Sequence, residues 1–387
     1  MKRKIVALVT GDGSGPEMMA PACKIAIEAA RRDDIDLVFE ETPMGWSAYD
    51  EYDDTLPKKS FDRAVEIGTI FFGGVGDPRF DATTGARRPE MKPEARCLLA
   101  LRKRMGLLLN FRPVIFYKEL AYLAKVRSEA IPDDGVQQIW IRFLLQDSYF
   151  GNEDYQRNPV FAPYFKIKSE ITGDEPVVLD LAYYDLLTLE KYFRAAFMYA
   201  KTMGLPLISV DKANAISRYV FWRKVATRIG KEFPGVPLAH QYVDSANALL
   251  FDPAKLHGVI ACGNEHGDIL SDGAAAAVGS IGLMCSSAIN PDTGAAMFES
   301  GGGTAPTLAG QNKANPIGRI LTVAMMLRHL GALNGATAID EAVKVTLRAG
   351  FRTEDLLGKD PEVAAKLVKT GLLLGTKEMG ETILHRL

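Results

Sequence analysis

The chain has 387 residues, of which 47% are hydrophobic and 24% charged, with a formal net charge of −2 at pH 7. This composition is typical of a folded globular protein rather than a disordered or fibrous one. The small net charge gives no electrostatic reason to expect binding to nucleic acid or to an acidic membrane surface. The length is enough for two or three domains.

The cysteines and the apolar runs indicate the compartment. The 4 cysteines lie far apart and form no CxxC pair, so we expect neither a structural zinc site nor a disulfide framework. No uninterrupted apolar run reaches the roughly 18 residues of a membrane span. The apolar run after the basic start is too short for a signal peptide. We therefore expect a cytoplasmic protein.

Short apolar runs alternate with helical patterns, which predicts an α/β fold. Strands are expected at residues 5–9, 37–40, 69–73, 207–210 and 258–261. Helices are expected at residues 16–32, 98–105, 185–203, 216–233 and 316–330. Residues 165–184 read as two strands around the turn TGDE, a β-hairpin expected to pair with another subunit.

The stretch GDGSGPE follows the first strand and looks like a phosphate-binding loop. A dinucleotide fingerprint needs G-x-G-x-x-G, but Pro16 occupies the place of the last glycine. Proline suits the first turn of a helix, where its missing N–H has no partner in any case. We therefore favour a tight strand-to-helix turn over a pyrophosphate loop.

Carboxylates at helical spacing form the next feature. Asp268 and Asp272, in NEHGDILSD, are four residues apart and would share one face of a helix. Their repulsion would be relieved by a cation, and oxygen ligands without thiols favour Mg²⁺ or Mn²⁺. Asp244, in HQYVDSANALL, is a candidate third ligand. The alternative, ordinary solvated carboxylates, stays open.

Three arginines lie in or beside apolar runs: Arg102, Arg112 and Arg142. A guanidinium in such surroundings requires an anion, and its planar fork suits a carboxylate. Internal salt bridges are an equal alternative. Lys212 follows an apolar strand, where an amine could act as a base or simply be a surface charge.

In chain order these motifs resemble one family, the β-decarboxylating dehydrogenases of (2R)-hydroxy acids, which include isopropylmalate and isocitrate dehydrogenases. The resemblance rests on GDGSGPE, LALRK, NFRP, YFG, SVDKAN, HQYVDSANALL, NEHGDILSD, GTAP and ANP, and spans nearly the whole chain. It implies a two-domain α/β fold that is not a Rossmann fold. Residues 1–103 and 257–387 would form the cofactor-side domain. Residues 104–256 would form the dimerisation and substrate domain, with an arm hairpin at about 152–184.

The resemblance also implies the site. The three arginines would bind the substrate's carboxylates, and the three aspartates would hold Mg²⁺ or Mn²⁺. Lys212 would be the base at the C2 hydroxyl, and Tyr149 would protonate the enol carbon. Asp244 and Lys212 would come from the partner subunit of a homodimer. The implied reaction is the NAD-dependent oxidative decarboxylation of a 3-substituted malate, with no nucleic acid or membrane as partner.

The cofactor loop departs from the family pattern. Relatives read E-P-V-H-G-S-A-P-D or E-A-T-H-G-T-A-P-K, whereas this chain reads ESGGGTAPT. Gly302 stands where a histidine usually lies against adenine, and Thr307 where an aspartate or lysine discriminates the cofactor. Without a cation for a 2′-phosphate we expect NAD, with NADP left open, bound weakly by a flexible loop. The implied cofactor residues are Glu299, Gly303, Thr304, Ala305, Thr307 and Asn315.

The segment that meets the C3 substituent is also altered. Isopropylmalate dehydrogenases read P-E-x-G-L-L-x-L-R, whereas PEARCLLALR keeps Leu98 and Leu99 but inserts one residue and brings in Arg96. The leucines favour an apolar substituent, while Arg96 could meet a carboxylate or phosphonate or, as an equal alternative, simply face solvent. Two alternatives therefore stay open: a specialised paralogue for an anionic substituent, and a non-catalytic regulatory subunit.

Overall fold

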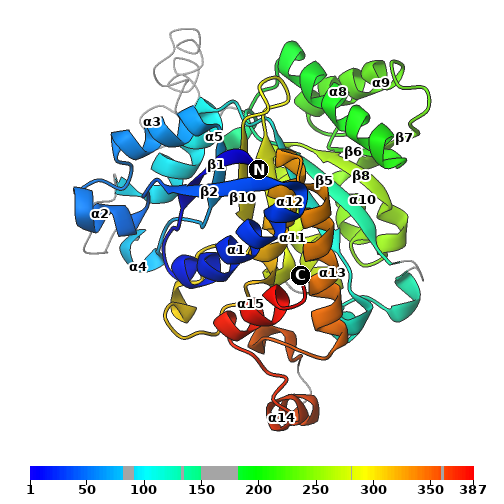
Figure 1. Ribbon diagram of the computed structural model, residues 1–387. Coiled ribbons are helices and arrows are strands. Elements are labelled where there is room, and N and C mark those ends of the chain that lie inside the picture. Colours follow the sequence, from blue (N-terminus) through cyan, green and yellow to red (C-terminus); the bar gives the residue numbers. More distant parts are fainter. Residues whose placement is uncertain (82–90, 132–134, 150–181, 280, 359–360) are drawn as a thin grey trace, which may run out of the picture.

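The computed structural model describes residues 1–81, 91–131, 135–149, 182–279, 281–358 and 361–387. It is an α/β structure around one mixed sheet (Figure 1). The strands are β1 (Lys2–Val9), β2 (Ile35–Glu41), β3 (Thr69–Phe72), β4 (Leu109–Ile115), β5 (Gln137–Phe143), β6 (Leu207–Asp211), β7 (Leu238–Tyr242), β8 (Gly258–Cys262), β9 (Cys285–Ile289) and β10 (Ala296–Ser300).

The helices cover both faces of this sheet. They are α1 (Gly15–Ala30), α2 (Trp46–Tyr52), α3 (Lys58–Ile67), α4 (Pro78–Asp81), α5 (Ala100–Arg104), α8 (Leu186–Met203), α9 (Ser217–Gly230), α10 (Val243–Leu249), α11 (Asn264–Val278), α12 (Ile317–Leu330), α13 (Leu333–Arg348), α14 (Pro361–Lys369) and α15 (Thr376–Leu384). A π-helical turn, Glu94–Leu99, leads into α5.

The ten strands of the described residues lie in the order β2-β1-β3-β10-β9-β4-β5-β8-β6-β7. Both outer parts of the sheet are parallel, whereas β10, β9, β4 and β5 pair antiparallel at its centre. Strand β10 pairs with β3 from more than two hundred residues earlier, so one part of the sheet is built from both chain ends. This pattern differs from an all-parallel doubly wound sheet.

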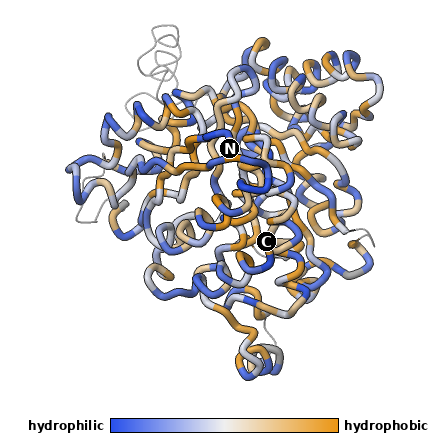
Figure 2. Tube along the Cα trace, in the orientation of Figure 1, coloured by the Kyte–Doolittle hydropathy of each residue, from blue (hydrophilic) through white to orange (hydrophobic). Residues whose placement is uncertain are grey.

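Among the described residues, buried apolar side chains form four clusters between the sheet and its helices. The largest lies between α1, α12, α13 and α15 and the strands β1, β2, β3, β9 and β10. A second joins α8 and α9 to β4, β5, β6 and β8. Figure 2 shows apolar stretches running through the interior, with hydrophilic ones along the periphery.

The ten elements expected from the sequence are confirmed as helices or strands, with shifted ends. The helix expected at 98–105 differs in type: its first residues belong to the π-helical turn, and the rest form the short α5. Most of the expected hairpin at 165–184 lies outside the described residues. The two-domain division remains a prediction. Strand β8, assigned by it to the first domain, pairs with β5 and β6.

The loop GDGSGPE is a tight turn in which several backbone N–H groups are bonded to other parts of the protein. The N–H of Asp12 donates to the Gly74 carbonyl at 3.0 Å, and that of Ser14 to the Thr304 carbonyl at 2.8 Å. The Asp12 carboxylate accepts backbone N–H groups from Trp46, Ser47 and Gly76 at 2.8–3.0 Å. These contacts hold the loop as a tight turn from β1 into α1, with Pro16 in the first turn of the helix as expected.

A substitution in this loop tests how closely it approaches the loop that contains Thr304. Gly13 has φ 59°, and a Cβ there would lie 2.3 Å from the Thr304 carbonyl oxygen. Gly13→Ala should therefore lower the free energy of unfolding by about 1–2 kcal/mol for the left-handed backbone and by a further ~1–3 kcal/mol for overpacking. Gly68→Ala is the matched control, because Gly68 has φ 76° but no atom within 4 Å of the added Cβ. Equal melting temperatures for the two variants would contradict the contact.

Acid should weaken the fold near the end of α12. His329 lies against Phe298, with ring centroids 5.5 Å apart, and burial lowers the pKa of His329 below 6.5. Below about pH 6.5 the unfolded chain takes up a proton that the native histidine resists, so stability falls as the pH falls. Replacing His329 by Gln should reduce the drop in melting temperature between pH 7.5 and 5.5 by on the order of 1 °C. His385→Gln, at an exposed position, should leave that drop unchanged.

Candidate active site

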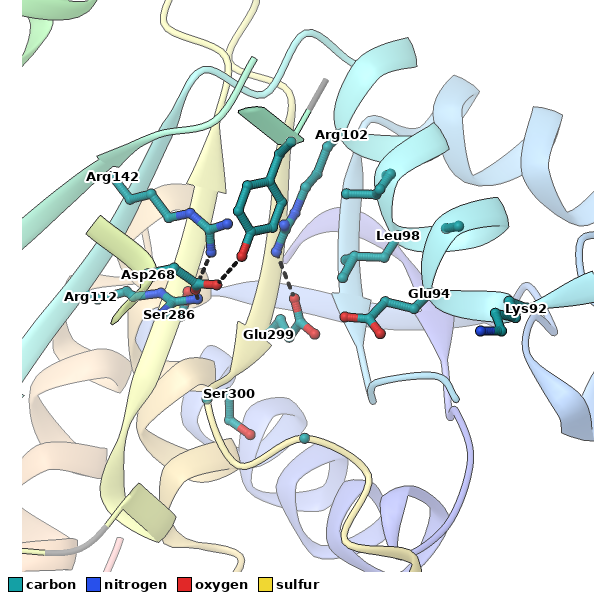
Figure 3. A pocket seen from close by; sticks show the side chains of 15 residues that line it. Lys92, Glu94, Leu98, Arg102, Arg112, Arg142, Asp268, Ser286, Glu299 and Ser300 are labelled. Carbon is teal, nitrogen blue, oxygen red and sulfur yellow. Dashed lines mark hydrogen bonds and ion pairs between the residues drawn. The ribbon is translucent and has the colours of Figure 1, made fainter. Parts of the chain in front are cut away.

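A cavity of about 490 Å³ opens between the segment that carries α5 and the strands β4, β5 and β10 (Figure 3). Most of the residues implied by the sequence to touch substrate meet here. The lining consists of Lys92, Glu94, Ala95, Leu98, Leu99, Arg102, Arg112, Arg142, Tyr149, Asp268, Ser286, Glu299, Ser300, Gly301 and Gly303.

The three predicted arginines reach the cavity from three elements. Arg112 and Arg142 lie on the adjacent antiparallel strands β4 and β5, two pairs apart in the register, because Asn110 is the partner of Arg142 and Trp140 that of Arg112. Arg102 comes from α5. All three are buried, with 2–9% of each residue exposed. The Nε of Arg112 donates to Asn110 and that of Arg142 to Asn264, both at 2.8 Å, so the guanidinium planes are fixed.

Asp268, on α11, is the common partner of these groups. Its Oδ1 pairs with Arg142 and, at 2.9 Å, with Nη2 of Arg112, while its Oδ2 accepts the Tyr149 hydroxyl at 2.9 Å. Burial alone would raise the pKa of Asp268, but the two guanidinium groups hold it below 3.8. Asp268 is therefore a fixed negative charge in the cavity.

Asp272 lies one helical turn further along α11. Its Oδ1 pairs with Nη1 of Arg112 at 2.8 Å. Burial raises the pKa of Asp272, with Arg112 acting in the opposite direction. Asp268 and Asp272 thus share Arg112 and lie on one helix face, as their spacing predicts.

Two buried donors at this cavity have no hydrogen-bond partner among the described residues: Nε of Arg102 and Nη2 of Arg142. Burial lowers the pKa of Arg102. Burial also lowers the pKa of Arg142, and the neighbouring Arg112 adds to this effect. An unpaired buried donor is costly, and more so when charged. A bound carboxylate would satisfy both groups, so the cavity is suited to an anion.

Tyr149 lies over this cluster. Its ring centroid is 4.8 Å from Cζ of Arg142. Burial raises the pKa of Tyr149, and the charge and hydrogen bond of Asp268 raise it further. The phenol therefore keeps its proton at neutral pH and is available as an acid.

Lys212 and Asp244 lie elsewhere. They form an ion pair with each other, at the end of β6 and in the first turn of α10, and neither lines the cavity. The side chain of Lys212 is 25% exposed and that of Asp244 66%. Within the described residues of one chain, no three His, Cys, Asp or Glu side chains gather as a metal site.

Of the three residues expected to meet the C3 substituent, two line the cavity and one does not. Leu98 and Leu99 line the cavity, but Arg96 is not among the lining residues. Its Nη2 pairs instead with Asp54 at 3.1 Å. The sequence reasoning missed Lys92 and Glu94, which do line the cavity. The signal for Glu94 was its place four residues before Leu98.

A second cavity, of about 520 Å³, adjoins the first at Ser300, which lines both. The expected cofactor residues Ala305 and Asn315 line this second cavity, whereas Glu299 and Gly303 line the first. Asn315 donates to Asp355 at 3.0 Å.

The remaining two expected cofactor residues make local contacts. The Thr304 carbonyl accepts from the backbone N–H and, at 2.9 Å, the hydroxyl of Ser14, and the Thr307 carbonyl accepts from Gln311 at 2.6 Å.

Arg319, on α12, supports the loop between the two cavities and was not singled out from the sequence. It is 1% exposed and donates to the carbonyls of Phe72 at 2.8 Å, Gly73 at 2.5 Å and Gly303 at 3.2 Å. The loop is therefore fixed at Gly303. A Cβ on Gly302, by contrast, would meet no atom within 4 Å.

Comparisons with known proteins agree with this site. The family model described as isocitrate/isopropylmalate dehydrogenase matches residues 5–383. The 3-isopropylmalate dehydrogenase of Geobacter sulfurreducens is 37% identical over 388 residues, covering 99% of this chain and 98% of its own. That of Desulfotalea psychrophila is 34% identical over 385 residues, covering 99% and 100%.

The fold has a solved counterpart. The crystal structure of isocitrate dehydrogenase from Methylococcus capsulatus is similar with a TM-score of 0.77 and 26% identity, covering 99% of both chains. Among the helices of the described ranges, none combines the length and apolar character needed to cross a bilayer. The chain belongs to the isocitrate/isopropylmalate dehydrogenase family and is a decarboxylating dehydrogenase that acts on a CH–OH group.

Proposed function

We propose that this protein catalyses the NAD-dependent, divalent-metal-dependent oxidative decarboxylation of a 3-substituted (2R)-malate to a 2-oxo acid. The observation that carries the proposal is the cavity in which buried arginines present unpaired donors beside Tyr149 and Asp268. Isopropylmalate is the reference substrate, because relatives over the full length are named 3-isopropylmalate dehydrogenase.

The arginines bind and orient the substrate. Malate carries two carboxylates, and a guanidinium fork binds each in a fixed plane. Arg102 and Arg142 have the unsatisfied donors, so they contact the carboxylates directly. Arg112, which already pairs with Asp268 and Asp272, completes the positive field around them.

The donor set at Asp268 and Asp272 fits a hard divalent cation, since both supply carboxylate oxygen. One chain brings no third such ligand to them among its described residues. Asp244 of a second subunit is the proposed third ligand, with Lys212 beside it, and the half-exposed position of that ion pair supports this arrangement. The protein is then a homodimer with shared active sites.

The chemistry follows from these positions. Lys212 would take the proton of the C2 hydroxyl, and NAD, when bound, would supply the acceptor for the hydride lost from C2. In the resulting β-keto acid the bond from C3 to its carboxylate breaks, CO₂ leaves, and the electron pair forms the enol. Tyr149 then donates its proton to C3. A bound divalent cation supplies Lewis-acid stabilisation of the negative charge on the C2 oxygen.

The second cavity favours NAD over NADP. Apolar side chains of Met18, Ile281 and Leu308 line it and can cover a base. Its charged residues are Lys313, Glu354 and Asp355, and Lys313 is already paired with Glu354 at 3.1 Å. A ribose hydroxyl can donate to a carboxylate there, whereas a 2′-phosphate would be repelled.

The proposal is tested by NADH and NADPH formation with Mn²⁺ and a panel of 3-substituted malates, including isopropyl, carboxymethyl and phosphonomethyl. We expect NADH formation with at least one of them. Lys212→Met should lower kcat by about 10²–10⁴, the range for a general base, with the substrate Kd nearly unchanged by calorimetry. No reduction of either cofactor by any member would favour a regulatory subunit.

The glycine loop predicts weak cofactor binding that can be repaired. Gly302 has space for a side chain and an ordinary backbone conformation, so Gly302→His should place a ring beside the second cavity. Stacking of about 0.5–1.5 kcal/mol corresponds to an NAD Kd up to roughly tenfold lower. Gly302→Ala is the control: it stiffens the loop without adding a ring, so it shows how much of any gain in affinity comes from stiffening alone. Equal Kd values for both variants would contradict a stacking role for this position.

A further inference from the structure

Asp147 is a buried residue with an unfavourable backbone conformation, two positions before Tyr149. Its φ is 73°, a left-handed value that is unfavourable for a residue with a side chain. Such conformations persist where the surroundings enforce them, and they cluster at functional sites. Asp147 is 0% exposed, whereas Tyr149 is 40% exposed. After β5 the chain therefore makes a left-handed turn that buries a carboxylate and then reaches the first cavity at Tyr149.

The carboxylate of Asp147 is held from two sides. Its Oδ2 accepts the Tyr184 hydroxyl at 2.7 Å, and its Oδ1 faces Nε of Arg218 at 3.4 Å. Burial raises the pKa of Tyr184 well above 10, so the hydroxyl keeps its proton and remains a donor. A Cβ on Gly263, the residue before α11, would lie 2.4 Å from the Tyr184 hydroxyl oxygen and 3.0 Å from Oδ2 of Asp147. The pair is thus packed tightly against the start of α11.

The backbone of this turn is fixed as well. The N–H of Asp147 donates to the Tyr183 carbonyl at 3.2 Å. The side chain of Asn264 donates to the carbonyls of Leu144 at 2.9 Å and Gln146 at 3.1 Å. Asn264 is 0% exposed and begins α11. The turn is therefore bonded to the same helix that carries the aspartates of the cavity.

The side chain of Tyr149 has weaker support than its backbone. Its hydroxyl donates to Asp268, and its ring lies against Arg142. In the proposed reaction Asp268 also binds a divalent cation, and Arg142 also binds a substrate carboxylate. Both contacts of Tyr149 are then shared with ligands during turnover. The direction of the phenol must therefore be set mainly by the backbone that precedes it.

We infer that Asp147 is the positioning residue for Tyr149: its buried, hydrogen-bonded carboxylate holds the left-handed turn that directs the tyrosine into the cavity. The inference rests on the proposed function, in which Tyr149 gives its proton to C3 of the enol. If the turn is loosened, oxidation at C2 and loss of CO₂ still take place. The enol then persists until water supplies the proton to C3, while the enol oxygen gives up its own proton and the C2 carbonyl is restored.

The test follows the proton that C3 receives. The protein turns over 3-isopropylmalate with Mn²⁺ and NAD in deuterium oxide, where the tyrosine hydroxyl carries deuterium. Delivery by Tyr149 labels one face of C3 and gives one singly deuterated 2-oxo acid, whereas delivery by solvent gives both. Proton NMR distinguishes them after a stereospecific dehydrogenase has reduced the C2 carbonyl, before C3 exchanges with solvent. We expect a single labelled product from the unmodified protein.

Two variants weaken the turn. Asp147→Gly removes the carboxylate and frees the backbone, since glycine adopts a positive φ readily. We expect both labelled products, a first-turnover burst of NADH at the unmodified rate, and a steady-state kcat about 10–100-fold lower, the scale for a displaced catalytic group. The calorimetric Kd of the substrate should be unchanged. Tyr184→Phe removes the donor to Asp147, and should change labelling and kcat in the same direction.

Three matched variants separate positioning from stability. Asp147→Asn tolerates the left-handed backbone and can hydrogen-bond Tyr184 through its amide, so it should restore the single product. Tyr192→Phe removes a hydroxyl from the same apolar cluster, one that donates to the Ile141 carbonyl at 2.5 Å. It should lower the melting temperature but keep the single product. Asp34→Gly, at an exposed position with φ 55°, should change neither labelling nor kcat.

The inference is overturned by any of three results. The first is a single labelled product at the unmodified kcat in Asp147→Gly or, where that variant does not fold, in Tyr184→Phe. The second is a mixture from Asp147→Asn as complete as that from Asp147→Gly. The third is a mixture from Tyr192→Phe equal to that from Tyr184→Phe.

Failure of the proposed function is recognised separately. Turnover with both labelled products in the unmodified protein would remove Tyr149 as the proton donor, and the inference with it. If no malate reduces NAD or NADP, the proposed reaction fails, and amide hydrogen exchange of residues 147–149 decides. Faster exchange in Asp147→Gly but not in Asp34→Gly would support the hold of Asp147 on this segment, and equal exchange would overturn it.

Discussion

The active site depends on how buried positive charge is held. Arginine side chains from β4, β5 and α5 are buried at the cavity, and burial lowers the pKa of Arg102 and of Arg142. Asp268 compensates by accepting from Arg112, Arg142 and Tyr149 at once. A buried charge without such a partner costs several kcal/mol. The compensation is incomplete, because two N–H donors have no partner within the part of the chain that the structure describes, and this incompleteness makes the cavity suited to a dicarboxylate.

The sheet places these groups from distant parts of the sequence. Arg112 and Arg142 are thirty residues apart but lie on adjacent strands, and α11, which follows β8 and packs on both strands, brings Asp268 to them. The loop after β10 is hydrogen-bonded to the loop after β1, because Ser14 donates to the Thr304 carbonyl. Arg319 connects the loop after β10 to the end of β3 through the carbonyls of Gly303, Phe72 and Gly73. The walls of both cavities are therefore held by contacts between segments that are far apart in the sequence.

Local patterns predicted the local structure well. Apolar periodicity located α1, α8, α9 and α12 and the strands β1, β2, β3, β6 and β8, because burial of one face is read directly from spacing. The motif residues Arg102, Arg112, Arg142, Tyr149 and Asp268 could be predicted to act together through family resemblance. The strand order and the antiparallel centre depend on long-range pairing, which spacing does not encode.

The misses have physical reasons as well. Arg96 was a candidate cavity residue because the altered segment brings in a cation, but its guanidinium meets Asp54, a contact between segments more than forty residues apart that local spacing does not show. Arg319 looked like an ordinary basic residue in a helix, since its carbonyl partners come from loops far away in sequence. Whether Lys212 and Asp244 complete the site depends on a second subunit, and one chain's sequence does not show that contact.

Ser300 borders both cavities, at the end of β10 and the beginning of the glycine loop. A ligand in either cavity that restricts this stretch reduces the conformational entropy the second ligand must remove. The two sites are then thermodynamically coupled, and the coupling is reciprocal: substrate tightens cofactor binding by the same factor as cofactor tightens substrate binding. Gly301 and Gly302 precede the point at which Arg319 holds the Gly303 carbonyl and have more backbone freedom than other residues, so coupling between the ligands would arise in this part of the loop rather than in either cavity alone.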